Sequence, residues 1–252
     1  MSEYLEQAVE AAKQAGELLA GRFGDHGAVT ERLTHDIKLA IDVESQTLIT
    51  EVLLGRFPDH AMLGEEGTAG DPASEYTWVV DPIDGTVNYY YGIPHFCVSI
   101  ALRHAERYLI GVVYDPMVQE LWTVSENEEP RLNGRPIAVS ARAELSEAII
   151  SMGFAKRSGA VEQSFPRYQA VAPTVRKMRM LGSAALAMAY VASGRLDGYV
   201  EEQVSRWDIA AGALLVERAG GKVVLTPHAG RSDRYSIVCT NGRIPLEELV
   251  RF

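Results

Sequence analysis

The spacing of apolar residues in the first quarter of the chain predicts two amphipathic helices. Between residues 3 and 23, apolar side chains such as Leu5, Val9 and Leu19 recur at helical intervals. Residues 40–56 repeat this pattern and stop before Pro58. A proline just beyond the last periodic residue is typical of a helix end.

The pattern then changes to short apolar runs that indicate β-strands. A strand-like run occupies 61–64, and a polar stretch at 68–76 predicts a loop. Three longer runs, at 96–104, 107–116 and 120–127, follow one another with brief turns between them. Strands in series with short links are typical of an antiparallel meander.

Beyond residue 145 the predicted elements alternate between strands and helices. We expect strands at 148–154, 175–181, 196–202, 222–226 and 235–241, and helices at 160–172, 183–193 and 207–219. Such alternation indicates an α/β layer. We therefore expect an α+β or α/β protein with two sub-domains, 1–145 and 146–252, and an active site between them.

Composition narrows the class of protein without defining it. The 252 residues are 47% hydrophobic and 23% charged, as in ordinary globular proteins, and the net charge of −10 argues against a nucleic-acid partner. The start resembles no signal peptide, and no run of 18 apolar residues suggests a membrane span. Cys97 and Cys239 lie in strand-like runs, which favours free buried thiols and a cytoplasmic location.

The most informative segment follows the apolar run at 78–80, which predicts a buried strand. Asp81 suits a helix N-cap, and Pro82 suits the first helical position. Residues three apart share one face of a helical turn, so Asp81 and Asp84 can converge on a hard cation. Gly85 allows the backbone to approach a ligand, and a helix start attracts phosphate. The segment therefore predicts a metal site beside an anion site.

Other carboxylates lie at the ends of predicted elements. Two of them, Asp36 and Asp42, flank the start of the second helix, and Glu65 and Glu66 follow a strand. We expect Glu65 to be a metal ligand, whereas Glu66 is either a further ligand or a solvated charge. Asp208 opens an apolar helix, where it is either an N-cap or a ligand.

Several motifs together resemble the inositol monophosphatase family of magnesium-dependent, lithium-sensitive phosphatases, a group that includes fructose-1,6-bisphosphatases. They occur in family order along nearly the whole chain: GEE at 64–66, DPIDGTVNY at 81–89, LNGRPIAVS at 132–140, GSAA at 182–185, GRLDGYVE at 194–201 and WDIAAGALLVERAGG at 207–221. The resemblance implies a layered αβαβα sandwich, two or three magnesium ions, inhibition by lithium and a homodimer.

The resemblance also implies roles for particular residues. Glu65, Asp81 and the carbonyl of Ile83 match ligands of one magnesium ion, and Asp81, Asp84 and Asp208 match those of a second. Such oxygen ligands suit magnesium. Asp42 and Thr86 match the pair that activates the attacking water, with Glu65 also counted as catalytic.

The remaining implied roles concern the substrate. The residues that match substrate-binding positions are Asp84, Gly85, Thr86, Gly182, Ser183, Ala184 and Glu201. Backbone N–H groups of Gly85 and Thr86 would hold the phosphate. The organic part would face the segment at 182–184, and Glu201 would accept a hydroxyl of the substrate.

The chain departs from the family pattern in a loop at 24–36, which we expect to be mobile. Many members carry a lysine where this chain has Glu31, so a third metal site cannot be transferred. A basic cluster (Arg176, Lys177 and Arg179) and Arg206 are either solvated or in contact with a second substrate phosphate.

Together these features predict a magnesium-dependent phosphomonoesterase that acts on a small polyol phosphate, with myo-inositol monophosphate as the first candidate. Fructose 1,6-bisphosphate, alone or as a second activity, histidinol phosphate and 3′(2′),5′-bisphosphate nucleotides are alternatives. A regulatory protein that binds phosphorylated metabolites is the non-enzymatic alternative.

Overall fold

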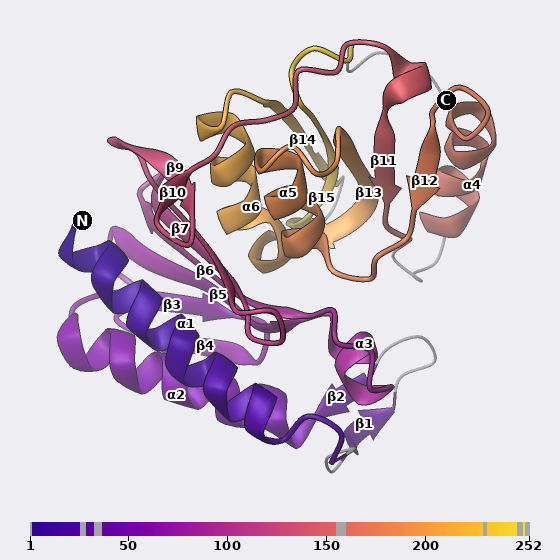
Figure 1. Cartoon of the computed structure of the whole chain (residues 1–252). Helices are drawn as coiled ribbons and strands as arrows, with labels where there is room; N and C mark the ends of the chain where they lie inside the picture. Colours follow the sequence, from indigo (N-terminus) through magenta and orange to yellow (C-terminus); the bar gives the residue numbers. More distant parts are fainter. Residues whose placement is uncertain are drawn as a thin grey trace.

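The computed structural model describes residues 2–25, 29–32, 37–154, 160–228, 231–245 and 249. Its helices and sheets form five layers (Figure 1). Helices α1 (Glu3–Gly21) and α2 (Ala40–Arg56) cover the outer face of the first sheet, and α4 (Ala160–Val171) covers the outer face of the second. Helices α5 (Ala184–Ala192) and α6 (Arg206–Arg218) lie between the sheets. The predicted αβαβα sandwich is confirmed.

The first sheet has eight strands in the order β10-β9-β8-β7-β6-β5-β3-β4. Their bounds are β3 (Ala61–Gly64), β4 (Gly67–Gly70), β5 (Tyr76–Asp84), β6 (Cys97–His104), β7 (Arg107–Asp115), β8 (Glu120–Ser125), β9 (Glu128–Leu132) and β10 (Arg135–Pro136). From β5 to β10 each strand pairs antiparallel with the next, which confirms the meander. Strand β3 pairs parallel with β5.

Two short hairpins occupy segments that were predicted as loops. Strand β4 pairs with β3 and overlaps the first residues of the polar loop predicted at 68–76. Strand β1 (Val29–Arg32) lies inside the loop predicted at 24–36 and pairs with β2 (Ile37–Leu39), which directly follows that loop. Strand β4 is an almost wholly exposed edge strand of glycine, threonine and alanine, so it carries no apolar alternation that could reveal it. Asp36 lies outside the described residues.

The second sheet has five strands in the order β12-β11-β13-β15-β14. Their bounds are β11 (Ile149–Met152), β12 (Lys177–Arg179), β13 (Gly198–Ser205), β14 (Lys222–His228) and β15 (Arg231–Thr240). Strands β12, β11 and β13 are parallel, while β15 is antiparallel to β13 and β14. The two short helices are α3 (Thr86–Tyr90) and the 3-10 turn η1 (Leu145–Glu147).

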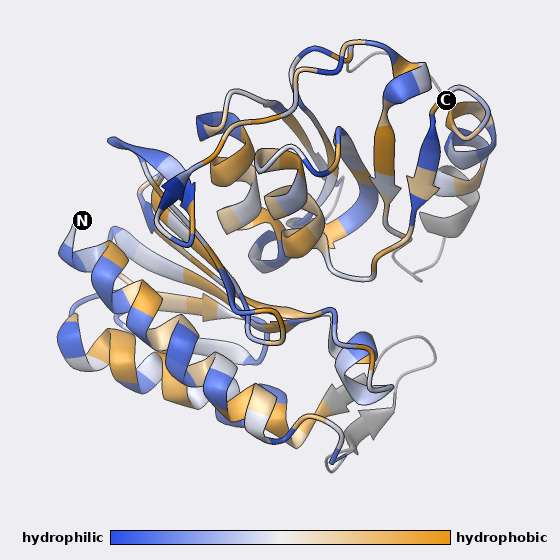
Figure 2. Ribbon diagram, viewed as in Figure 1, coloured by the Kyte–Doolittle hydropathy of each residue, from blue (hydrophilic) through white to orange (hydrophobic). Residues whose placement is uncertain are grey.

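The central helices join the two sheets through a single apolar core. This core combines α5 and α6 with Val79 and Trp122 of the first sheet and Ile237 of the second. Helix α6 approaches β7 so closely that a Cβ on Gly111 would lie 3.1 Å from the backbone of Ala211. Figure 2 shows α5 and α6 as largely hydrophobic, whereas α1 and α2 carry polar residues on their outer faces.

Residues 137–144, which connect the last strand of the first sheet to the second half of the chain, form no helix or strand. We propose this stretch as the boundary region of the two sub-domains. No helix in the described part of the chain is both long and apolar enough to cross a membrane.

Candidate active site

The segment with Asp81 and Asp84 is extended, so the helical turn predicted from Pro82 is wrong. Strand β5 reaches Asp84, and its pairing with β6 shifts register between the two aspartates. The Asp81 carboxylate accepts a 3.0 Å hydrogen bond from the Ile83 N–H, a local bond that competes with helix formation. Helix α3 begins only after Gly85. An irregularity in the strand therefore sets the spacing of the two carboxylates.

The Asp84 carboxylate joins the two halves of the molecule. It accepts hydrogen bonds from Ser183 Oγ (2.5 Å), Ala184 N (3.2 Å) and Ala185 N (2.7 Å) at the start of α5. Burial raises the pKa of Asp84, and these bonds oppose the rise. Ser183 and Ala184 therefore contact a predicted metal ligand, and their contact with substrate stays a prediction.

Thr86 and Asp42 lie together, as a water-activating pair requires. The Thr86 hydroxyl is 3.4 Å from Asp42 Oδ1 and also donates to the Ile83 carbonyl at 2.9 Å. Asp42 is buried at the start of α2, where its second oxygen accepts a 2.8 Å bond from Leu39 N. Helix α2 thus fixes the carboxylate in front of the threonine.

Glu65 lies in the turn between β3 and β4, where the strand has ended. Its N–H donates to the Val80 carbonyl of β5 at 3.2 Å, which places it beside the strand that carries Asp81. Burial raises the pKa of Asp81 well above its ordinary value, and the charges of Glu65, Asp84 and Asp208 add to the rise. Glu66 follows in the same turn, and its N–H donates to Gln46 Oε1 at 2.9 Å.

Asp208 lies in the first turn of α6, as its position before an apolar helix indicated. Ser205 is the N-cap, and its N–H donates to Asp208 Oδ2 at 2.8 Å. Burial and the charge of Asp84 raise the pKa of Asp208 to about 7, while Ser205 and the charge of Arg234 oppose the rise. Asp208 therefore has a structural role in the helix and also faces the carboxylates of the first sheet.

These carboxylates influence one another's ionisation without converging on a single point. Within the described residues, no three His, Cys, Asp or Glu side chains converge closely enough to hold a metal. Burial raises the pKa of Asp81, Asp84 and Asp208, and the charges of neighbouring carboxylates add to the rise for Asp81 and Asp208.

Two glycines allow the halves to meet beside the carboxylates. Gly85 has a φ of +103°, and a Cβ there would lie 3.2 Å from the Gly182 carbonyl. Gly182 has a φ of +78°, and a Cβ there would lie 2.9 Å from Asn88 Nδ2. Asn88 donates to the carbonyls of His95 and Leu181 at 2.8 and 2.9 Å. Sequence reasoning assigned Asn88 no role, although it lies inside the DPIDGTVNY motif and could have been suspected there.

Glu201 lies on β13, just before an irregularity in its pairing with β15. The hydroxyl of the buried Tyr199 donates to Glu201 Oε2. A Cβ on Gly153 would collide with the same carboxyl group, so the glycine makes room for it. Burial raises the pKa of Glu201 to about 8, against the bond from Tyr199. Tyr199 and Gly153 thus adjoin Glu201, a predicted site residue. Tyr199 lies inside the GRLDGYVE motif and could have been suspected there, whereas no sequence signal singled out Gly153.

The basic residues left open by the sequence have different surroundings. Arg206 hydrogen bonds to the Tyr235 hydroxyl and lies over its ring. In contrast, Arg176, Lys177 and Arg179 are exposed at the edge of the second sheet. Arg206 is therefore bonded within the protein, and the cluster at 176–179 is available to solvent.

The two packed sheets, with acidic side chains where they meet, place the protein in the α+β class. Comparison with known proteins identifies the family. The chain matches the model of the inositol monophosphatase family over residues 1–250. It is 38% identical to inositol monophosphatase 2 of Solanum lycopersicum over 92% of this chain and 91% of that protein. It is 39% identical to Nus factor SuhB of Pasteurella multocida over 88% of this chain and 85% of that protein.

A solved structure gives the same result for the fold. An inositol monophosphatase from Anabaena (Nostoc) superposes with a TM-score of 0.85 at 38% identity, covering 98% of this chain and 94% of that one. The chain belongs to the inositol monophosphatase family.

Proposed function

We propose that this protein is a magnesium-dependent phosphomonoesterase that hydrolyses a small polyol phosphate by direct attack of an activated water. One observation carries the proposal. The hydroxyl of Thr86, which is two residues after Asp84, lies 3.4 Å from the buried Asp42 carboxylate. A hydroxyl beside a fixed carboxylate can accept a proton from water while passing its own proton on. A protein that only binds a phosphate has no need of such a pair.

The donor set around this pair fits magnesium. Asp81 and Asp84 are buried, and the pKa of each is raised because burial disfavours their negative charge. A divalent cation would reverse this penalty, and oxygen ligands are those that magnesium prefers. Glu65, Asp81 and the Ile83 carbonyl would hold one ion. Asp81, Asp84 and Asp208 would hold a second, for which their carboxylates would have to approach one another more closely than they do here. When bound, magnesium lowers the pKa of a coordinated water and stabilises negative charge on the phosphate.

The protein's own groups then orient the reactants. Asp42 is held by Leu39 N and accepts the Thr86 proton at Oδ1, so that the threonine oxygen is free to accept a proton from water. The hydroxyl has one hydrogen, and its present bond to the Ile83 carbonyl at 2.9 Å must be exchanged for the bond to Asp42. Backbone N–H groups of Gly85 and Thr86 would hold the phosphate.

The organic part of the substrate would face the second half of the molecule. Tyr199 occupies Oε2 of Glu201, which leaves Oε1 to bond a hydroxyl of the substrate. Because its pKa is about 8, Glu201 carries a proton at neutral pH in the metal-free protein and can both donate and accept. Such a group suits a neutral polyol, and the segment at 182–184 would line the other side.

The alternative substrates differ in the charge that they bring. A second phosphate, as in fructose 1,6-bisphosphate or a 3′(2′),5′-bisphosphate nucleotide, would need a cation near the organic part. Arg206 is already bonded to Tyr235, which supports a monophosphate. We therefore place myo-inositol monophosphate first, ahead of fructose 1,6-bisphosphate, a dual activity and histidinol phosphate.

The proposal is tested by measuring phosphate release at equal magnesium from inositol 1-phosphate, fructose 1,6-bisphosphate, histidinol phosphate and a 3′(2′),5′-bisphosphate nucleotide. We expect release from inositol 1-phosphate that requires magnesium, is inhibited by lithium and falls at least about hundredfold in Asp42→Asn. Absence of release from every substrate would refute the enzymatic function. Sedimentation of the same preparation would test the proposed homodimer.

A second candidate function is that of a regulatory protein with no need for catalysis. It is favoured by the 39% identity to a relative named Nus factor SuhB, which is as similar as the relatives named for the phosphatase activity. The absence of a nucleic-acid partner and the cytoplasmic location stay predictions. If regulation is the function, Asp42→Asn would abolish phosphate release and leave the cellular role intact.

A further inference from the structure

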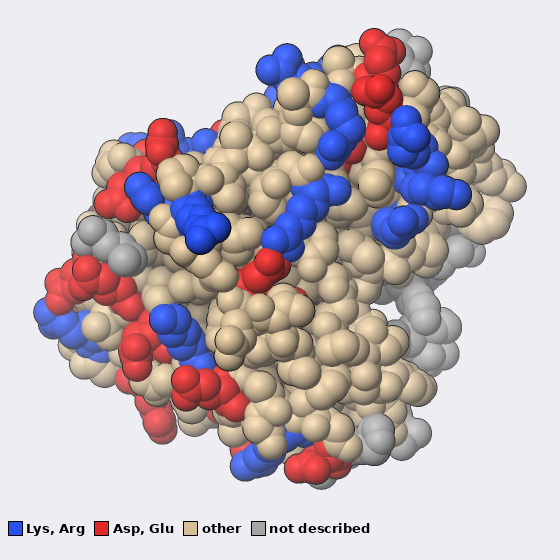
Figure 3. Space-filling view, in the orientation of Figure 1, with Lys and Arg blue, Asp and Glu red and all other residues tan. Residues whose placement is uncertain are grey.

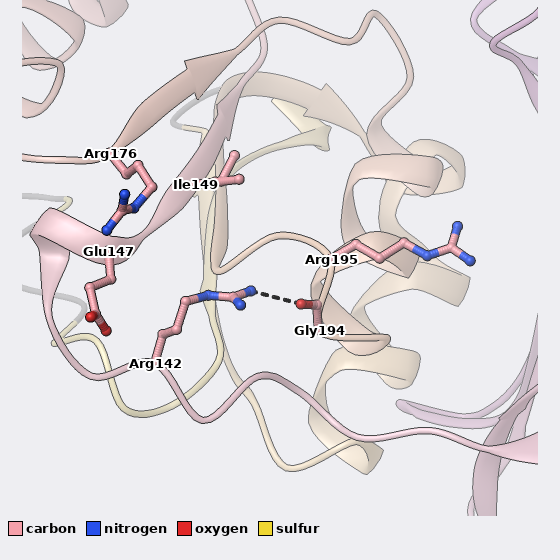
Figure 4. A pocket seen from close by; sticks show the side chains of 6 residues that line it. All are labelled: Arg142, Glu147, Ile149, Arg176, Gly194 and Arg195. Carbon is pink, nitrogen blue, oxygen red and sulfur yellow. Dashed lines mark hydrogen bonds between the residues drawn. The ribbon is translucent and has the colours of Figure 1, made fainter.

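A pocket of about 460 Å³ opens on the second half of the molecule, and Figure 4 shows the side chains that line it. It is lined by Arg142, Glu147, Ile149, Arg176, Gly194 and Arg195. Ile149 begins β11, Arg176 directly precedes β12, and Gly194 and Arg195 shortly precede β13. The pocket therefore lies at the amino ends of three parallel strands.

The candidate active site lies at the opposite ends of the same strands. Gly153 directly follows β11, Gly182 lies three residues after β12, and Glu201 directly follows Val200, which pairs with Met152 at the end of β11. A strand rises about 3.3 Å per residue, so strands of three or four residues keep the pocket on the order of 10 Å or more from the carboxylates. The pocket is thus a separate feature and not part of the proposed active site.

Arg142 is fixed in place by a buried partner. Its Nε donates to both carboxylate oxygens of Asp197 at 2.8 and 3.0 Å, and its Nη2 donates to the Gly194 carbonyl at 2.7 Å. A guanidinium has five N–H bonds. Within the described residues, three of those of Arg142 have no partner, and the side chain is 37% exposed. Arg142 thus presents a pre-oriented cation to the pocket.

The other charged side chains of the pocket have distinct roles. Arg195 bonds to both oxygens of Glu120 at 2.5 Å, and Figure 4 shows it directed away from Arg142. Arg176 is exposed, and Glu147 is the one acidic residue of the lining. Asp197 offsets the charge of Arg142, and Glu120 offsets that of Arg195, so the pocket offers guanidinium N–H donors rather than an excess of positive charge. Figure 3 shows Lys and Arg side chains gathered over this half of the molecule.

We propose that this pocket binds a small organic anion, whose phosphate or carboxylate group lies between Arg142 and Arg176. Arginine forks match both groups through paired hydrogen bonds, and a pre-oriented guanidinium loses less freedom on binding than a flexible one. The volume is in the range of small-molecule sites. Ile149 supplies an apolar wall for the organic part of the ligand.

The test is a titration of magnesium-free protein followed through its backbone amide resonances, with inorganic phosphate in one arm and citrate in the other. Without magnesium, the proposed active site has no cation to attract either anion. We expect saturable shifts of the Ile149 and Gly194 resonances in at least one arm. The arm that responds at the lower concentration identifies the group, phosphate or carboxylate, that the pocket prefers.

Three variants of exposed residues make the test specific. Arg176→Gln should weaken binding about tenfold, because it removes a charged hydrogen-bond donor. Arg179→Gln, three residues further along the chain on the edge strand β12 and outside the pocket lining, is the matched control and should leave binding unchanged. Glu147→Gln should tighten binding, because it removes a like charge.

Two results would overturn the proposal. One is the absence of shifts at Ile149 and Gly194 in both arms up to the solubility limit. The other is equal weakening by Arg176→Gln and Arg179→Gln, which would mean general surface attraction. Neither result depends on phosphatase activity, so failure of this binding proposal would leave the proposed enzymatic function untouched.

Discussion

Asp81 and Asp197 are both hidden from water, with 2% and 0% of their surfaces exposed, but their surroundings are opposite. Asp197 accepts bonds from the Arg142 guanidinium, from Ser140 Oγ and from Ile149 N. For Asp81, burial raises the pKa, and the charges of Glu65, Asp84 and Asp208 add to the rise. One buried aspartate is neutralised by its neighbours, and the other is not.

The difference separates a structural carboxylate from a functional one. A buried charge with a cation and several donors holds segments together, and its removal leaves the partners unsatisfied. A buried charge among like charges costs stability until a cation arrives. Burial alone therefore does not identify a site, whereas the sign of the neighbouring charges does.

The largest expected effect is that of Asp81→Asn on turnover. We expect kcat to fall about thousandfold or more, because the variant loses a ligand shared by both proposed metal ions. The thermal midpoint of the metal-free protein should stay the same or rise, since a repelled charge has been removed. Phosphate release and thermal unfolding measure the two effects. Asp59→Asn, at an exposed aspartate, is the control, and a less stable Asp81→Asn variant would contradict the comparison.

Asp197→Ala should lower the stability of the protein, in contrast to Asp81→Asn. It leaves the Arg142 guanidinium without its partner, and we expect the free energy of unfolding to fall by about 3–5 kcal/mol. Urea denaturation measures the change. In a double-mutant cycle with Arg142→Met, the two substitutions together should cost less than the sum of the single ones. Additive losses, or a loss below about 1 kcal/mol, would show that Asp197 is not held by its charge partner.

Glu201 lies between these extremes, since its bonded neighbour is the neutral Tyr199. Its pKa rises from 4.5 to about 8 on folding, so between these pH values the unfolded chain has lost a proton that the folded protein retains. Stability is therefore greatest below the lower value and falls as pH rises through this window.

We expect this fall to be on the order of a few kcal/mol in magnesium-free protein and to be absent in Glu201→Gln. Chemical denaturation of both proteins at a series of pH values measures it. Parallel pH profiles of the two proteins would mean that Glu201 ionises normally.

The elements with a clear apolar period could be predicted from sequence, and those without it could not. Helix α1 ends at Gly21 and α2 at Arg56, both within two residues of expectation. Strand β4 was missed because its exposed residues carry no pattern. The helical turn at Asp81 was wrong because Pro82 also suits an irregular strand, and local propensity does not distinguish the two.

For the candidate site, the motifs singled out residues that the structure brings near one another, but they did not predict the contacts between them. Asp84 could be singled out because it closely follows an apolar run, and Asp208 because it directly precedes the apolar residues of a helix. The bonds from Ser183 and Ala185 to Asp84 join residues about a hundred positions apart, and no local rule predicts them. The network around Asp197 was missed for the same reason, although Asp197 stands inside the GRLDGYVE motif.

The core shared by the two sheets has a consequence for synthesis on the ribosome. Val79 and Trp122 complete their packing only against α5 and α6, which end at Arg218. At typical elongation rates, roughly 5–15 s separate the appearance of the first sheet from that of α6. During this interval the nascent chain presents an apolar face about one sheet wide. A transiently exposed apolar surface of this kind favours aggregation, so we expect the nascent chain to be most prone to aggregate during this period of translation.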